Sequence, residues 1–321
     1  MRFWSPFEDL MADVHSTEGF VNSHAHLDRA YTVSPTMMNL TKNHLHEKWK
    51  LVDDVKRSRT VEDYAKGIEL ALDMQTWYGT SHVCSFIDID DVVGTKAIDG
   101  ALIAREKVDG IEALFACQTL KGVLNENIGL LHENIHKFDI LGSLPGADKG
   151  RESEHIDVMM RLAKDNDLML HVHVDQLNTP DEKETELLCR KTIQHGMEGR
   201  VVAVHSISLA AHKKSYREEV YRMAKDANMM FVSCPTAWID HPRSETLMPF
   251  HNAITPADEL IQHDLTVAIG SDNIHDIYKP YADGDMSVEL RFLLEACKIY
   301  DKDVLKNIAV NNGLLVCGII N

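Results

Sequence analysis

The sequence predicts an α/β protein built as a (β/α)8 TIM barrel, and two patterns support this prediction. From residue 19 onward, eight short β-rich runs alternate with stretches of helical periodicity. Strands separated by helices pair in parallel, and eight such units can close into a barrel. Polar residues gather where several of these runs end, which is where barrel enzymes carry their catalytic groups. An open doubly wound sheet would give the same alternation.

The predicted elements follow one another without a break in composition. The eight strands are expected within residues 19–26, 81–89, 111–118, 139–146, 168–175, 201–208, 229–236 and 265–272. Apolar residues recur at helical spacing between them, as in 60–79 and 153–167, and a helix over 181–195 would end at Gly196. Since no Pro/Gly/Ser-rich linker or repeat divides the chain, we predict one barrel domain over 19–321 behind an N-terminal extension over 1–18.

Composition excludes several classes of protein. The 321 residues suffice for a large core, and the formal net charge of −17 opposes binding to a nucleic acid backbone. No apolar run is long enough to span a membrane, and the N-terminus lacks the basic and apolar segments of a signal peptide. The six cysteines form no CxxC pair, as expected for buried thiols in a reducing compartment. We therefore expect a cytoplasmic location.

Four histidines and one aspartate at predicted strand ends indicate a metal site. His24 and His26 close the first run, and residues i and i+2 of a strand share a face, so both imidazoles can reach one ion. His173, His205 and Asp272 lie at the ends of the fifth, sixth and eighth runs. Imidazole and carboxylate ligands suit zinc or ferrous iron, and three or four of them leave a position for water. Such a metal lowers the pKa of water toward about 7 and so generates a nucleophile.

These segments resemble the amidohydrolase superfamily, and within it the cytosine deaminase-like branch. The similarity runs from about Gly19 to Gly313, and it rests on GFVNSHAHLDRAY (19–31), HVDQ (173–176), AVHSISLAAH (203–212) and AIGSDNIHDIY (268–278). The resemblance implies a metal-dependent hydrolase that acts on carbon–nitrogen bonds other than peptide bonds. It implies one divalent metal, zinc or iron, held by His24, His26, His173 and Asp272. Because ILGSLPG at the end of the fourth run has no lysine, the bridging lysine of binuclear relatives is absent and a mononuclear site is expected.

Three positions depart from the cytosine deaminase-like pattern. The branch carries a glutamate that moves protons to the ring of the base, and Gln176 stands there instead; an amide can hydrogen-bond but cannot transfer a proton in that way. The closest match to the glutamine that reads the pyrimidine is Leu120, and Asn273 replaces a second aspartate. These differences argue against cytosine as the substrate.

The resemblance also implies roles in catalysis. Asp272 would act alone as the base, taking a proton from the attacking water and giving it to the leaving nitrogen. His205 would lie beside the nucleophile or substrate and stabilise the oxyanion. Asp175 and Gln176 would orient the substrate or support His173.

Substrate contacts are expected in the loops that follow the strands. One or two of the basic residues Arg29, Lys121, Lys149 and Arg151 would bind an anionic group. Aromatic residues after strands seven and eight would pack against a ring. The predicted substrate residues are Leu120, Arg151, Asn273, Trp238 and Tyr278. The expected partner is a small molecule, heterocyclic or anionic, that carries an amide, a cyclic amide or an amino group.

Three alternatives remain open at this point. A deaminase of an unusual base is the nearest one. The HExxH motif at 132–136 is typical of zincin proteases, although the apolar stripe of its predicted helix favours an outer barrel helix. The short termini indicate that the accessory β-sandwich of relatives is absent or truncated. A catalytically degenerate binding barrel is therefore the third alternative. Barrel surface that the sandwich would cover is then exposed, and a homodimer could cover it. The intact metal set favours the enzyme.

Overall fold

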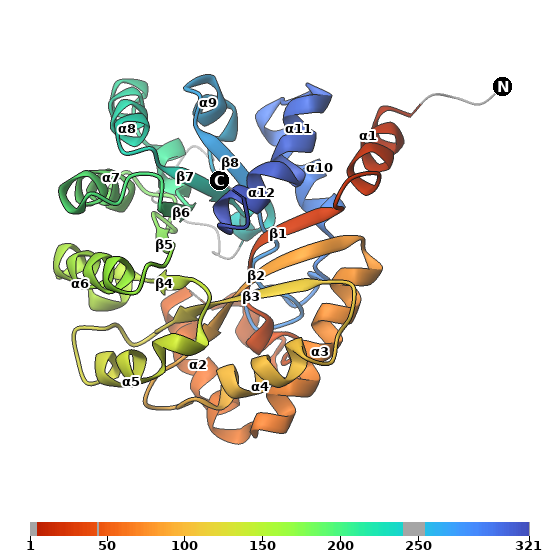
Figure 1. The fold of residues 1–321 in the computed structure, drawn as a ribbon, viewed down its shortest axis with the longest axis vertical. Helices are drawn as coiled ribbons and strands as arrows, with labels where there is room; N and C mark the ends of the chain where they lie inside the picture. Colours follow the sequence, from red (N-terminus) through yellow and green to blue (C-terminus); the bar gives the residue numbers. More distant parts are fainter. Residues whose placement is uncertain (1–4, 44, 240–253, 321) are drawn as a thin grey trace.

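A computed structural model describes residues 5–43, 45–239 and 254–320, which form a barrel of parallel strands surrounded by helices (Figure 1). Each of the eight predicted runs overlaps one strand, and the second strand begins one residue before its run, at Thr80, so the predicted strands are confirmed. The strands are β1 (Phe20–Ala25), β2 (Thr80–Asp88), β3 (Glu112–Gln118), β4 (Leu141–Ser143), β5 (Leu170–Val174), β6 (Val201–His205), β7 (Met230–Ser233) and β8 (Thr266–Ile269).

The ring closes through two joins between a three-stranded and a five-stranded parallel sheet. The sheets have the orders β1-β2-β3 and β4-β5-β6-β7-β8, and the bridges Ala25↔Asp272 and Ala116↔Ile140 connect them. Gly142 lies at the second join, where an added Cβ would come within 1.9 Å of the carbonyl oxygen of Cys117. The strands can approach here because glycine has no Cβ. A closed barrel, rather than an open sheet, is therefore the architecture.

Helices cover the outside of the ring and place their apolar faces against the strands. The predicted helix at 181–195 begins at Glu184 and ends at His195, and Gly196 follows with a φ of 61°, the left-handed conformation that glycine favours at helix ends. No described helix is both long and apolar enough to cross a bilayer. The described helices are α1 (Pro6–His15), α2 (Leu45–Ser58), α3 (Val61–Trp77), α4 (Lys96–Arg105), α5 (Asn127–Asn134), α6 (Glu152–Asp165), α7 (Glu184–His195), α8 (Lys214–Asp226), α9 (Ala257–Gln262), α10 (Met286–Cys297), α11 (Lys302–Ala309) and α12 (Asn311–Val316).

The zincin interpretation of the HExxH segment is wrong. Helix α5 ends at Asn134, and a 3-10 turn over Ile135–Lys137 follows it, so the motif does not lie on one helix. His132 and His136 are both exposed. Among the described residues, neither belongs to a group that could hold a metal. Leu131 is buried in the core instead, as the apolar stripe predicts.

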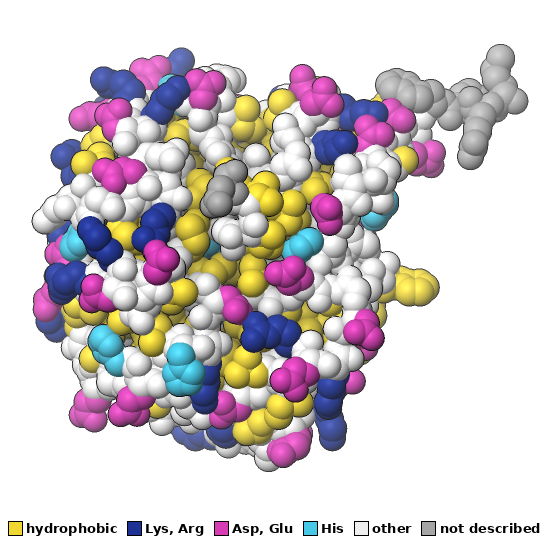
Figure 2. Space-filling view, in the orientation of Figure 1, with side chains coloured by type: hydrophobic (Ala, Val, Ile, Leu, Met, Phe, Trp, Pro, Cys, Tyr) yellow, Lys and Arg dark blue, Asp and Glu magenta, His cyan; other side chains and the backbone are white. Residues whose placement is uncertain are grey.

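Helix α12 packs against the beginnings of the barrel strands, at the end opposite the predicted site. Its Gly313 lies against Val21 of β1, and Asn312 donates a hydrogen bond to the carbonyl oxygen of Val267 of β8 at 2.7 Å. Figure 2 shows apolar side chains in the middle of this face, ringed by charged side chains of both signs. Helix α12 thus covers the end of the barrel where the strands begin, and the predicted site lies at the opposite end.

His171 lies inside the barrel, two residues before His173 on β5. Its ring contributes Nε2 to a 2.7 Å hydrogen bond with the carbonyl oxygen of Val316, and burial lowers its pKa to about 4. An unfolded histidine titrates near 6.5. Between these values the unfolded chain binds a proton that the folded protein does not bind, so stability falls as the pH falls from 6.5 to 4.

We therefore expect His171→Gln, which keeps a hydrogen-bond donor but cannot titrate, to reduce acid sensitivity. Between pH 7 and pH 4.5 the wild-type protein should lose about 2 kcal/mol more free energy of unfolding than the variant. Urea unfolding of both proteins without metal, followed by circular dichroism, measures the difference. If the free energy of unfolding depends on pH in the same way in both proteins, the pKa of His171 does not differ between the folded and the unfolded chain.

Candidate metal centre

A bridge between Ala25, the last residue of β1, and Asp272, three residues after β8, brings His24, His26 and Asp272 together. The backbone amide of His26 donates to the carbonyl oxygen of Asp272 at 3.2 Å, and that of Asp272 donates to the carbonyl oxygen of His24 at 2.9 Å. Asp272 adopts a φ of 60°, a left-handed conformation that aspartate tolerates better than most residues. The chain therefore turns sharply at the strand end and directs its carboxylate toward the two imidazoles.

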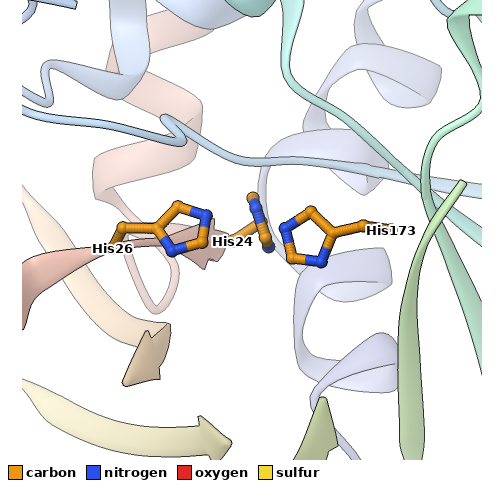
Figure 3. Close-up of side chains that lie close together, drawn as sticks. All are labelled: His24, His26 and His173. Carbon is orange, nitrogen blue, oxygen red and sulfur yellow. The ribbon is translucent and has the colours of Figure 1, made fainter. Parts of the chain in front are cut away.

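The side chains of His24, His26 and His173 point toward one common centre (Figure 3). One nitrogen from each of these three rings lies within 4.8 Å of the others, and the same limit holds for His24, His205 and Asp272. Asp272 Oδ1 lies 3.3 Å from His26 Nε2 and 3.7 Å from His24 Nε2. All five predicted residues thus converge, as expected for four ligands of one ion with His205 beside them.

Burial fixes the protonation states of this cluster. The five residues are each at most 4% exposed. Burial lowers the pKa of His24 and of His26 to about 4, and that of His205 to about 3. Burial alone would raise the pKa of Asp272, but the adjacent rings of His24 and His26 hold it well below its ordinary value. Near neutral pH the cluster therefore consists of neutral imidazoles around an ionised carboxylate, the states in which these groups bind metals.

Several nitrogens in the cluster lack any hydrogen-bond partner among the described residues. They are both ring nitrogens of His24, Nε2 of His173 and Nδ1 of His205. An unsatisfied buried polar atom costs about 1–3 kcal/mol, so unpartnered nitrogens on three neighbouring rings indicate that this cluster binds a ligand. A divalent metal fits this donor set in charge, in ligand type and in number.

A chain of hydrogen bonds leads from His173 to the neighbouring strand and helix. His173 Nδ1 lies 3.4 Å from the carbonyl oxygen of Ser143. The hydroxyl of Ser143 lies 2.9 Å from Nε2 of His155, whose Nδ1 lies 2.6 Å from Asp148 Oδ2. Contacts of this kind orient the ring of a metal ligand and fix its tautomer.

Asp175 does not support His173, so this expectation was wrong. Its carboxylate accepts hydrogen bonds from the backbone amides of Glu184 at 2.7 Å and Thr185 at 3.1 Å. These amides belong to the first turn of α7, where unpaired N–H groups attract carboxylates. Asp175 therefore stabilises the helix and does not line the cavity.

A cavity opens beside the metal cluster at the strand ends. Six of the eight predicted catalytic and substrate residues line it, as does Arg29. Its wall consists of His26, Arg29, Trp49, Gln118, Leu120, Leu144, His173, Gln176, His205, Ile207, Ala237, Asp272, Asn273 and Tyr278.

Two predicted substrate residues are not placed in this wall. Arg151 precedes α6 and is exposed, and both its Nε and its Nη2 bind the carboxylate of Glu154, at 2.9 and 2.7 Å. It is not a contact of the cavity, because that local ion pair holds it on the surface. Trp238 belongs to the 3-10 segment Pro235–Ile239, and its side chain lies outside the described part of the structure.

The other basic candidates differ in position. Lys121 forms a 2.8 Å ion pair with Asp53, and Lys149 lines a separate groove beside α7. Asn273 lines the cavity, but its amide also donates to Asp276 Oδ2 at 2.5 Å. Of the four basic residues singled out in the sequence, Arg29 alone lines the cavity in the described structure.

Gln118 is a cavity residue that the sequence analysis missed. It is the last residue of β3 and is 4% exposed, and its Oε1 has no hydrogen-bond partner among the described residues. The analysis took Leu120 as the counterpart of the branch's glutamine, yet a glutamine is present two residues earlier. The rule that functional residues close the strands would have found it at the end of FACQ. Leu120 is therefore no evidence against cytosine as the substrate.

Comparison with known proteins agrees with the geometry. A model of the amidohydrolase family matches residues 17–307. An uncharacterised protein of Haemophilus influenzae is 46% identical over 250 residues, covering 76% of this chain and 90% of that protein. The N-isopropylammelide isopropyl amidohydrolase of Pseudomonas sp. is 25% identical over 276 residues, which are 84% of this chain and 65% of that enzyme.

A solved structure shows the same fold over nearly the whole chain. The 5-methylcytosine deaminase of Klebsiella pneumoniae, bound to phosphonocytosine, superposes with a TM-score of 0.87 at 23% identity. The match covers 94% of this chain and 75% of the deaminase. The family match, which spans most of the barrel and the converging histidines, confirms the resemblance seen in the sequence. The protein belongs to the amidohydrolase family and is a hydrolase of carbon–nitrogen bonds other than peptide bonds.

Proposed function

We propose that the protein removes an amino or alkylamino group from a small nitrogen heterocycle, with one zinc or ferrous ion held by His24, His26, His173 and Asp272. The observation that carries the proposal is the set of buried, unpartnered imidazole nitrogens beside an ionised carboxylate. The names of two similar proteins, an isopropylammelide amidohydrolase and a 5-methylcytosine deaminase, support a heterocyclic substrate.

The cavity wall suits a flat ring with polar edges. Leu120, Leu144 and Ile207 supply apolar surface, and Gln118 and Gln176 supply amides that can both donate and accept hydrogen bonds. Binding sites for small molecules typically combine an apolar lining with a few placed polar groups. The wall would hold the ring so that the carbon bearing the leaving amine faces Asp272.

The residues of the cluster divide the chemistry between them. A bound divalent metal supplies Lewis acidity, which polarises the substrate and acidifies water. Asp272, ionised near neutral pH, accepts the proton of the attacking water and returns it to the leaving nitrogen. His205 is neutral, so it keeps one N–H that can stabilise negative charge as it develops on the substrate. Gln176 holds the ring but does not carry protons.

The metal content of protein purified without chelators or a histidine tag tests the first half of this proposal. Elemental mass spectrometry should find about one zinc or iron per chain, and His173→Ala should lose it. His171→Gln, on the same strand and outside the cluster, is the matched control and should keep it. A metal-free wild-type protein that also refuses added zinc and iron would refute the hydrolase mechanism and favour a degenerate binding barrel.

We expect Gln176→Glu to increase deamination of ring substrates by about 10²-fold or more, because a carboxylate at this position can carry a proton. Ammonia release from cytosine and other aminoheterocycles, measured beside alkylamine release, checks this expectation. Gln118→Glu introduces the same group elsewhere in the wall and should not produce the gain. Wild-type protein that already deaminates such rings as fast as the variant would show that Gln176 does not limit proton transfer.

A further inference from the structure

Arg29 is a buried cation at the wall of the cavity. It is 5% exposed and belongs to the 3-10 turn Leu27–Arg29 that follows β1. Its guanidinium contacts Nδ1 of His26, and its Cζ lies 5.3 Å from the centre of the Tyr278 ring. Its Nε lies 3.7 Å from Asp28 Oδ1, beyond hydrogen-bond distance. Among the described residues of the wall, it alone carries a positive charge.

Two further polar groups of the cavity wall have no hydrogen-bond partner among the described residues. The hydroxyl of Tyr278 and the Oε1 of Gln118 are buried, and neither has a hydrogen-bond partner among the described residues; the same holds for Nε of Arg29. The three atoms offer two donors and one acceptor. Together they match an anionic oxygen on a ring whose neighbouring N–H group is free to bind Gln118.

The charges around Arg29 favour an anion on the cavity side. Asp88, Asp28 and Asp276 lie near the guanidinium but do not line the cavity. The carboxylate of the wall, Asp272, is held by His24 and His26. Lys48 lies over the same Tyr278 ring, with Nζ 5.7 Å from its centre, and adds positive potential. These carboxylates balance the buried charge from behind, but Nε of Arg29 still lacks a hydrogen-bond partner among the described residues, and an anionic oxygen of the substrate would accept a charge-assisted hydrogen bond from it.

We infer that the substrate is an anion: a small nitrogen heterocycle with a negatively charged oxygen that binds Arg29 and Tyr278 while the adjacent ring N–H binds Gln118. This inference rests on the proposed function for the heterocycle and the leaving amine. The charge can come from the ring itself, as in a deprotonated cyclic imide, or from an attached carboxylate. Both place an oxygen anion on the guanidinium, where charge-assisted hydrogen bonds are strong.

Ligand binding tests the inference without turnover. At pH 7 barbiturate carries its charge on the ring, orotate carries it on a carboxylate, and uracil is a neutral ring of similar shape. Isothermal titration calorimetry on the metal-loaded protein should find one of the anions bound at least about tenfold more tightly than uracil. The stronger of the two anions identifies the source of the charge.

Variants at Arg29 assign the preference to this residue. Arg29→Gln should weaken binding of the preferred anion by about 10- to 100-fold and leave uracil binding unchanged, and Arg29→Lys should retain part of the preference. Arg151→Gln removes one positive charge outside the cavity and should change neither the binding of the preferred anion nor the binding of uracil. Thermal melting and elemental analysis of each variant show that fold and metal are kept; if Arg29→Gln does not fold, Arg29→Lys must still show reduced preference.

Equal binding of anions and uracil by the wild-type protein, or an anion preference that survives Arg29→Gln, would overturn the inference. Its failure differs from failure of the proposed function. A protein that holds no metal and hydrolyses nothing, yet binds barbiturate or orotate through Arg29, would refute the hydrolase mechanism and support the anion subsite.

Discussion

Replacing Asp272 with asparagine should reduce turnover by about 10³-fold or more, the largest effect expected of any single change. The substitution keeps the size of the side chain and its tolerance of the left-handed backbone at φ 60°. It removes the negative charge that His24 and His26 approach at 3.7 and 3.3 Å. An amide binds a divalent metal more weakly and cannot accept the proton of the attacking water.

Metal content, thermal stability and kcat/KM on an aminoheterocycle that the wild-type protein hydrolyses should be measured together for Asp272→Asn. We expect less metal and lost activity in a protein that still melts cooperatively. If activity persists within tenfold of the wild-type value, Asp272 is not the base. If the metal stays bound while activity is lost, its role is proton transfer rather than metal binding.

Asp175→Asn is the matched control for this experiment. Asp175 also follows a barrel strand and also has a left-handed backbone, with a φ of 54°. Its carboxylate binds the first turn of α7 instead of the metal cluster. The variant should therefore lose about 1 kcal/mol of stability, as for the loss of a helix cap, and keep its metal and its activity.

These two aspartates show where prediction from the sequence reaches its limit. Both close predicted strands, and their positions in the sequence therefore predict that both face the site. The direction of each carboxylate depends on a tertiary neighbour: the histidines of β1 for Asp272, and an amide pair nine and ten residues further along for Asp175. Strand-end position is visible in the sequence, but the competition between two hydrogen-bonding partners is not.

The fold was easier to predict than the cavity for a physical reason. Each strand is a run of buried β-rich residues, so its signal is repeated along the element, and all eight runs overlap a strand. Cavity residues are single positions. Trp49 reaches the cavity from α2, far from any strand end, and no pattern in the sequence places that helix. Arg29 and Arg151 look alike in sequence, and only the ion pair of Arg151 with Glu154 separates them.

The second large effect is expected on stability, from Lys56→Met. Lys56 lies in α2 and is 1% exposed, and its Nζ binds Asp90 at 2.5 Å and Asp88 at 3.1 Å. Burial alone would lower the pKa of Lys56, but the two carboxylates raise it above its ordinary value, so the lysine remains charged. Methionine fills a similar volume and leaves both aspartates without their cation. Removing one partner of a buried ion pair typically costs about 3–5 kcal/mol.

Chemical denaturation of Lys56→Met should show this loss, whereas Lys107→Met should lose less than about 1 kcal/mol, because its 3.4 Å pair with Glu69 is exposed. The loss of the Lys56 ion pairs should also weaken substrate binding. Lys56 fixes α2, which carries Trp49 to the cavity, and Asp88 donates its backbone amide to the carboxylate of Asp28 beside Arg29 at 2.9 Å. We therefore expect proteolysis within 45–58 to accelerate and KM to rise more than kcat falls. A stable variant with unchanged KM would show that α2 is held by its apolar contacts alone.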